Sequence, residues 1–227
     1  MINKPVSFAE LNSHETLPPY RTSAGGGNWQ AIPHKDLVSC VMDVLSRKES
    51  WFTYDPIIML SKDKRDITLT VPMHPKASSQ DYSLLLGFVG SNSGQKRIKM
   101  YAGVGTEREN VWLMQLPFSI KHLKSIELSE AIDCAVNKVF MPMSKRIPHE
   151  VGLLKQEEIS KGDAERVLMQ AGRDRLIPWT RIGVADHLFS KSECTQWNLL
   201  CAFAFATKVS PANQQMDKIV KFKRMLP

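Results

Sequence analysis

Five short apolar segments, separated by polar, glycine or proline residues, fill the chain between residues 57 and 116. In the segment 66–71, Ile67, Leu69 and Val71 alternate with polar residues, which is the period of a strand with one buried face. Pro72, Pro75 and the Ser78-Ser79 pair are expected to break this strand. The other segments are 57–60, 82–89, 96–104 and 110–116. Because short connections join antiparallel neighbours, the pattern predicts a meander of about five strands and not a parallel sheet.

Helical periodicity precedes this predicted sheet. Leu37, Val41 and Leu45 recur at every fourth residue and predict a helix over 35–47. Either His34 or Asp36 lies near its start. A helix placed before an antiparallel meander, with further helices after it, defines the α+β class.

Helical periodicity returns after the sheet, from residue 118 onward. The pattern fits one long helix or two short ones, the second beginning at Ser129 and ending at Met141-Pro142. Gly172 is expected to end a later helix. The remaining predicted helices cover 149–160, 162–171, 180–189, 193–208 and 211–225, the last as a short basic helix or a tail.

The chain is predicted to have three parts. Residues 1–33 lack apolar periodicity and contain Pro18-Pro19 and Gly25–Gly27, which predicts a flexible N-terminal arm. A phosphate-binding glycine loop is disfavoured there, because no G-x-x-x-x-G-K-[ST] pattern follows. Residues 34–140 form the predicted α+β core with the antiparallel sheet, and residues 141–227 form a helical, basic C-terminal region packed on it.

Membrane insertion, secretion and metal binding are all disfavoured. The sequence has no run of about 18 apolar residues and no apolar stretch near Met1, so we expect a cytoplasmic protein. Cys40, Cys134, Cys194 and Cys201 form no C-x-x-C pair, and we expect buried free thiols on helices. No metal and no cofactor are predicted.

Positive charge is concentrated in the C-terminal part of the chain. The formal net charge is +7. Residues 1–91 hold 9 basic and 9 acidic side chains, whereas residues 141–227 hold 14 basic and 9 acidic ones, a difference of +5. Such an excess attracts nucleic acid or an acidic protein surface. Ordinary solubility charge is the alternative interpretation.

Three clusters of basic residues are the candidate nucleic-acid contacts. Basic groups interleaved with aromatic rings suit phosphate neutralisation together with base stacking. The first cluster contains Lys96, Arg97, Lys99 and Tyr101, with Arg108 and Trp112 nearby in sequence. The second contains Arg173, Arg175, Trp179 and Arg181, and the third contains Lys218, Lys221, Lys223 and Arg224.

The first cluster leads to the most specific structural prediction. Arg97, Lys99 and Tyr101 alternate onto one face of their strand, and binding requires that face to be exposed and continuous with Arg173 or the C-terminal tail. The alternative interpretation of the first cluster is the exposed face of a half-buried sheet. That of the third cluster is a solvated tail.

No catalytic motif is recognisable, and no catalytic residue is predicted. The chain lacks G-x-S-x-G and H-E-x-x-H, and its six histidines are scattered. Asp186 and His187 are adjacent in a predicted helix, where neighbouring residues face apart. Acidic and tryptophan side chains have simpler roles: Glu127, Glu130, Glu157 and Glu158 as solvated helix charges, and Trp51 and Trp197 as packing residues.

Several phrases resemble a phage- and plasmid-like family of unknown function, domain-of-unknown-function family 932. They are His34-Lys35-Asp36-Leu37 with the meander after it, Tyr82-Ser83-Leu84-Leu85-Leu86-Gly87-Phe88, Ile177–Gly183, and the tryptophan-bearing stretch Gln196–Phe203. The resemblance spans about residues 34–225. The histidine and aspartate of the family's turn are missing from Val89–Gly94, and Cys201 stands where asparagine is common. The resemblance implies a protein of a mobile genetic element in its host cell and implies no reaction.

Three functional hypotheses follow. The first is a nucleic-acid-binding accessory protein of a phage or plasmid, in single-strand DNA handling or recombination, with single-stranded DNA as the favoured partner. The second is a protein-binding inhibitor of host defence, of anti-restriction or anti-CRISPR type, which an exposed apolar patch would favour. The third, least favoured, is an enzyme, which needs a concave pocket with converging polar groups. Two questions stay open: whether the nucleic acid is DNA or RNA, and whether the protein is a monomer or a homo-oligomer.

Overall fold

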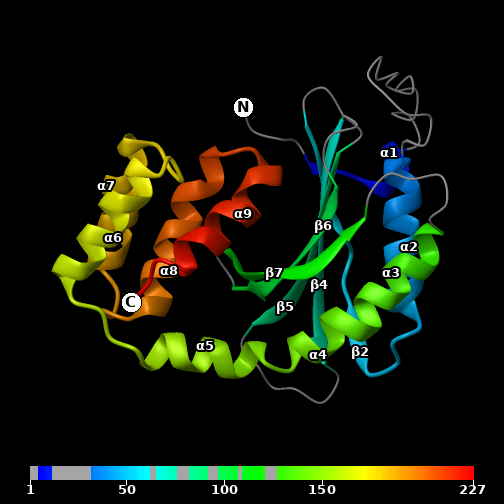
Figure 1. The fold of residues 1–227 in the computed structure, drawn as a ribbon, viewed down its shortest axis with the longest axis horizontal. Coiled ribbons are helices and arrows are strands. Elements are labelled where there is room, and N and C mark those ends of the chain that lie inside the picture. The colour runs from blue at the N-terminus through cyan, green and yellow to red at the C-terminus, as the bar shows by residue number, and fades with distance from the viewer. Residues whose placement is uncertain are drawn as a thin grey trace.

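The computed structural model describes residues 5–11, 32–61, 65–75, 82–91, 97–106, 109–120 and 127–227. Its centre is an antiparallel sheet in the order β1-β3-β4-β5-β6-β7, with β2 paired to β4 (Figure 1). The strands are β1 (Pro5–Val6), β2 (Trp51–Thr53), β3 (Ile57–Leu60), β4 (Asp66–Pro75), β5 (Ser83–Ser91), β6 (Ile98–Gly105) and β7 (Asn110–Ile120). The predicted α+β class and the meander from β3 to β7 are confirmed.

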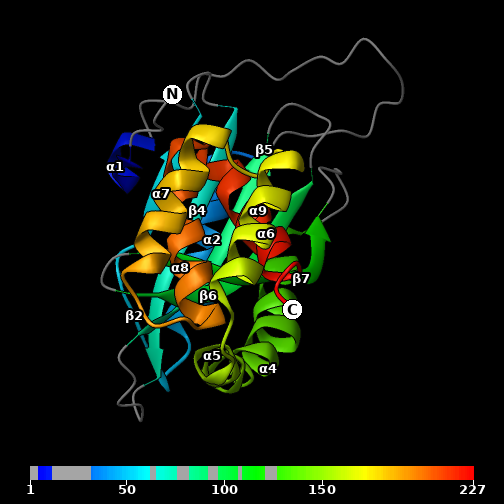
Figure 2. The same cartoon turned by 90° about the vertical axis from the view of Figure 1, so that its left-hand side faces the viewer.

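Helices lie on both sides of this sheet (Figure 1). On one side lie α2 and α3, and on the other lie α8 and α9, with α6 and α7 beyond them (Figures 1 and 2). The helical elements are α1 (Phe8–Leu11), α2 (His34–Ser46), α3 (Leu128–Ala135), the π-helical η2 (Val136–Phe140), α4 (Met141–Ser144), α5 (Ile147–Gln156), α6 (Lys161–Arg173), α7 (Trp179–Ser190), α8 (Gln196–Ala206), η3 (Thr207–Val209) and α9 (Ala212–Lys223).

Both faces of the central strands are buried. A Cβ added to Gly90 would lie 3.3 Å from Ile67 Cγ2 and 3.7 Å from Leu37 Cδ2, so this face packs on α2. A Cβ added to Gly87, on the opposite face, would lie 2.6 Å from the Trp112 ring and 2.9 Å from Met216 of α9. Alternation along β4 therefore reflects two covered faces, and not one covered face and one wet face.

The prediction that Pro72 breaks the strand is wrong, because β4 runs through Pro72 and has Pro75 as its last residue. β2 and β3 lie in line along one edge of β4: Thr53 pairs with Met73 and Ile57 pairs with Thr70. Between these two pairs, the edge segment advances four residues, from Thr53 to Ile57, while β4 advances three, from Met73 to Thr70. The edge segment therefore carries one extra residue. The Pro72 carbonyl accepts a hydrogen bond from the Tyr54 N–H (3.0 Å). The missing N–H of Pro72 faces the same irregular stretch, where no regular ladder bond is needed.

The long helical region after the sheet differs from the prediction at three points. The segment assigned to a helix from residue 118 is still β7 as far as Ile120. Glu127, and not Ser129, is the N-cap of α3. Pro142 does not end the helix, because η2 runs directly into α4 and the helical backbone continues through Pro142 to Ser144.

The N-terminal part of the chain takes part in the sheet. Within the predicted arm, Pro5 and Val6 pair with Met59 and Ile58 of β3, and Leu11 is buried. Gly25–Gly27, Pro18-Pro19 and the predicted turn 62–64 lie outside the described residues. The longest described helices, α2 and α6, have 13 residues, and none of the described helices has the length and apolarity needed to cross a bilayer.

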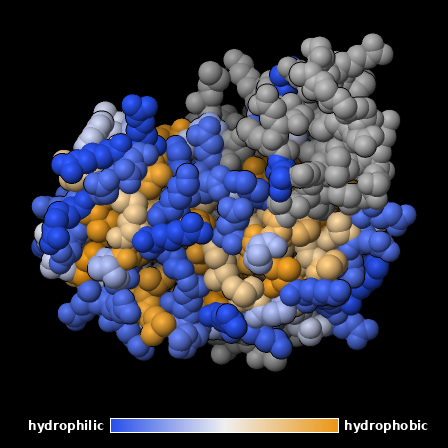
Figure 3. Space-filling model, in the orientation of Figure 1, coloured by the Kyte–Doolittle hydropathy of each residue, from blue (hydrophilic) through white to orange (hydrophobic). Residues whose placement is uncertain are grey.

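The packing predictions for tryptophan are confirmed, since Trp197 is buried and Trp51 packs against the core while half-buried. The expectation of buried thiols is not met. Cys40, Cys194 and Cys201 are half-buried, and Cys134 is exposed. On the face shown in Figure 3, hydrophobic residues reach the surface in patches between hydrophilic ones.

Candidate nucleic-acid interface

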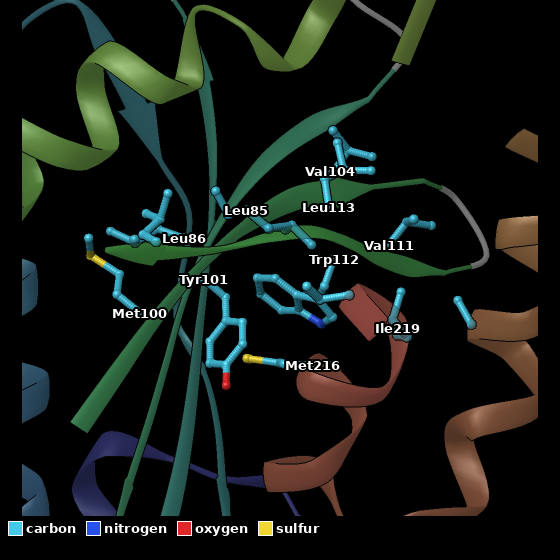
Figure 4. Packing of buried hydrophobic residues seen from close by; sticks show 14 of the residues in the cluster. Leu85, Leu86, Met100, Tyr101, Val104, Val111, Trp112, Leu113, Met216 and Ile219 are labelled. Atoms are coloured by element: carbon cyan, nitrogen blue, oxygen red, sulfur yellow. The ribbon is translucent and has the colours of Figure 1, made fainter. Parts of the chain in front are cut away.

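The aromatic residues of the first predicted cluster lie in the core. Tyr101 is 0% exposed and Trp112 is 4% exposed. Their rings meet edge to face with centroids 6.4 Å apart, and Figure 4 shows both pointing toward Met216 of α9. The prediction of an exposed stacking face on β6 is therefore wrong, because α9 covers it.

The basic residues of the first cluster are partly used to hold α9 on the sheet. The Tyr101 hydroxyl donates a hydrogen bond to Asp217 Oδ1 (2.6 Å), and Lys99 Nζ lies 3.2 Å from Asp217 Oδ2. Burial raises the pKa of Tyr101, and the hydrogen bond to Asp217 and its charge raise it further, so the phenol stays protonated. Arg97 is exposed, and Lys96 and Arg108 lie outside the described residues.

The third cluster belongs to a packed helix and not to a solvated tail. Lys223 forms an ion pair with Glu150 of α5, and Lys218 donates a hydrogen bond to Ser210 Oγ (2.8 Å). Burial lowers the pKa of Lys218 and of Lys223, and the charge of Arg224 lowers that of Lys223 as well. Lys221 and Arg224 are exposed at the end of α9. Part of this cluster therefore stabilises the fold.

The second cluster lies at the surface on residues 173–181, from the last residue of α6 to the first turn of α7; this segment is called the α6–α7 connector below. Trp179 is 55% exposed. Arg173 and Arg175 are exposed and Arg181 is half-buried. Asp174 is the one acidic residue within 173–181, and it accepts a hydrogen bond from Gln170 Nε2 (2.9 Å). Of the three predicted clusters, this one combines an exposed aromatic ring with exposed guanidinium groups.

Helix α6 ends in a Schellman motif with an arginine at its left-handed position. The Leu176 N–H donates to the Ala171 carbonyl (2.9 Å) and the Arg175 N–H to the Gly172 carbonyl (3.0 Å). Arg175 has φ 57°, the one positive value among the non-glycine residues that the structure describes. Glycine is usual there, and another residue costs about 1 kcal/mol. Gly172 was expected to end the helix, but the chain turns three residues later.

Gly172 does not end the helix but allows α7 to pack closely against α6. A Cβ at this position would lie 2.5 Å from Ile182 Cδ1 and 3.1 Å from Trp179 Cε3 and Cζ3. The six-membered ring of Trp179 thus lies directly against the α6 backbone. Leu176 and Ile177 are buried and anchor the connector. The Trp179 side chain is therefore held in place while much of it faces solvent.

The surface-exposed parts of the second and third clusters are apart in space. The α6–α7 connector lies at the upper end of these helices in Figures 1 and 2, whereas the C-terminus lies lower in both views. Because α9 covers Tyr101 and Trp112, the first cluster has no exposed aromatic ring among its described residues. The connector remains the strongest candidate interface.

One buried charged group was missed by sequence reasoning. Glu109, just before β7, is 7% exposed, and Lys208 Nζ lies 2.9 Å from its Oε1. Burial raises the pKa of Glu109, and the hydrogen bond and charge of Lys208 oppose that rise. Burial, with the Glu109 charge, also raises the pKa of Cys201 to about 12. Glu109 precedes β7 and Lys208 lies in η3, and no local sequence pattern connects them.

Among the residues that the structure describes, no three His, Cys, Asp or Glu side chains gather in a way that would hold a metal ion. Glu157 accepts a hydrogen bond from Gln196 Nε2 (2.8 Å), which ties α8 to the end of α5.

No family model matches this chain, and no curated protein or solved structure is similar enough to count as a match. The resemblance to the phage- and plasmid-like family stays a prediction.

Proposed function

We propose that this chain is a nucleic-acid-binding accessory protein of a phage or plasmid, and that it binds through the α6–α7 connector. The observation that carries the proposal is the exposed Trp179 ring on a short segment that also carries Arg173, Arg175 and Arg181. Guanidinium groups neutralise phosphates, and an exposed indole offers a stacking surface for a base. The protein would act in the cytoplasm of the host cell, in single-strand DNA handling or recombination.

Two further features support this placement. α7 begins at Trp179, and no side chain caps its N-terminus, so the positive end of the helix dipole adds to the arginine charges. The connector also lies in the part of the sequence with the basic excess, residues 141–227. Both features favour a ligand with closely spaced negative charges, such as a nucleic acid, over a protein surface that carries only scattered carboxylates. The proposal includes no metal and no cofactor.

The test is a fluorescence-anisotropy titration of labelled single-stranded and double-stranded DNA at low and moderate salt. A variant with Arg173, Arg175 and Arg181 changed to Gln is compared with a control in which the exposed Arg47, Arg146 and Lys191 are changed to Gln. Both variants lose three positive charges. We expect the connector variant to bind at least about tenfold more weakly and the control to lose much less. Equal losses in both variants, or no binding by the wild type at low salt, would refute the proposal.

A second candidate function is inhibition of a host-defence protein, and a different surface favours it. Phe52, Tyr54 and Ile57 are 55%, 52% and 43% exposed along the β2–β3 edge. Phe52 lies opposite His74 in the β2–β4 register, and the Tyr54 ring packs edge to face on His74 at 5.7 Å. Neighbouring exposed apolar side chains mark many protein-binding surfaces.

The two candidates respond to different substitutions. If the protein inhibits a host-defence protein through this edge, changing Tyr54 and Ile57 to Ser should abolish binding of that protein. The same change should leave any DNA binding through the connector unaffected. Loss of DNA binding in the same variant would argue against two separate surfaces.

A further inference from the structure

Arg175 occupies a backbone position that favours glycine. It follows α6 in the left-handed region, and its own N–H and that of Leu176 are fixed on Gly172 and Ala171. Strain retained at a non-glycine residue points to a use for its side chain. The buried Leu176 and Ile177 hold the backbone just after it. The Arg175 guanidinium is therefore presented at the surface from a rigid turn.

Trp179 is fixed on the same turn. Its six-membered ring lies against Gly172, which leaves 55% of the residue exposed. Met169, three residues before Gly172 and therefore on the same face of α6, is also 44% exposed. A ring held in this way loses little freedom when a flat ligand stacks on it. A base inside a duplex cannot reach such a ring, because both of its faces are already stacked.

We infer that the connector is a short single-strand site, in which one unpaired base stacks on Trp179 and an adjacent phosphate is bound by Arg175. Arg173 and Arg181 bind the flanking phosphates. This inference rests on the proposed function and deepens it by naming the ligand as an unpaired nucleotide of a single strand. With three arginines on the connector, the logarithm of the binding constant should fall against the logarithm of salt with a slope of about −2 for a single strand.

The test uses the full chain with an oligothymidylate of about 12 nucleotides and with a duplex of the same length. Trp179→Ala should weaken oligothymidylate binding by about tenfold or more, and Trp179→Phe should restore most of it, because Phe keeps a stacking face. Arg175→Gly should weaken binding and reduce the steepness of the salt slope by about 0.7. The same Gly substitution should raise the melting temperature, so weaker binding by this variant cannot come from misfolding.

The outcomes separate this inference from the proposed function. Equal affinity for the duplex, together with no effect of Trp179→Ala, would overturn the single-strand site and leave nucleic-acid binding in place. Unchanged affinity and salt slope in Arg175→Gly would overturn the phosphate role of Arg175. Absence of binding to either probe at low salt would overturn both the inference and the proposed function.

Discussion

The β6 strand and the α6–α7 connector carry similar residues, but the aromatic ring is buried on β6 and exposed on the connector. Both combine basic side chains with an aromatic ring: Lys99 and Tyr101 on β6, and Arg175 and Trp179 on the connector. Tyr101 is 0% exposed, whereas Trp179 is 55% exposed. Local composition therefore does not determine whether such a pair faces solvent. What determines it is whether another element brings an apolar surface to cover the ring.

On β6, the covering element is α9. Met216, Ile219 and Phe222 are buried against the sheet and α8, and the Phe222 ring stacks on Phe203 with centroids 3.7 Å apart. The polar tip of Tyr101 is satisfied by Asp217 of the same helix. On the connector, Gly172 supports one side of Trp179 and the rest of the residue stays exposed. Burial gives Tyr101 a structural role and leaves Trp179 available for a ligand.

The largest expected difference between the two regions is in stability. Trp112→Ala, next to Tyr101, should lower the free energy of unfolding by about 3–5 kcal/mol, because it leaves a cavity between β7 and α9. Trp179→Ala should lower it by less than about 1 kcal/mol, since this side chain is half in solvent. Urea unfolding of both variants checks this contrast. Similar losses in the two variants would contradict the assignment of Trp179 to the surface.

A smaller effect is expected where α9 is attached to the sheet. Asp217→Ala leaves the buried Tyr101 hydroxyl without its acceptor and should destabilise the fold by about 1–3 kcal/mol. Asp217→Asn keeps an acceptor oxygen and serves as the matched control, with a smaller loss. Neither variant should change DNA affinity when measured well below its melting temperature. Changed affinity in the Asn variant would return the β6 face to consideration as an interface.

The smallest effect concerns the pH dependence of stability near Glu109. Burial raises the pKa of this carboxyl above its ordinary value of 4.5, so the folded state binds the proton more tightly than the unfolded state. The contribution of Glu109 to stability is therefore greatest below pH 4.5 and is lost as the pH rises through the folded-state pKa. Gln resembles the protonated, neutral form of Glu109. The melting temperatures of the wild type and of Glu109→Gln should therefore converge as the pH falls through this range. A constant gap would argue against the shift.

Regular periodicity explains which parts of the fold could be predicted from sequence. α2 and strands β3 to β7 were predicted because their apolar residues recur with the period of a helix or a strand. The continuation of β4 through Pro72 was not predictable, because it depends on the extra residue between β2 and β3. The burial of Thr68 and Thr70 on the second face depends on helices far along the chain.

The candidate site was predictable only where its residues are contiguous. Arg173, Arg175, Trp179 and Arg181 lie within one connector, so their proximity follows from the sequence itself. The loss of Tyr101 to the core required α9, which begins more than a hundred residues later. The left-handed Arg175 was missed because Gly172 is the stronger local stop signal, although Gly172 is needed for packing against Trp179.

Hydrogen–deuterium exchange with and without a saturating oligothymidylate tests most directly whether the connector, and not the sheet face, binds nucleic acid. The account predicts slower exchange in peptides covering residues 173–181 when the oligonucleotide is present. Peptides covering residues 97–105 of the β6 region should exchange at the same rate in both samples. Protection at 97–105 with no change at 173–181 would contradict the account.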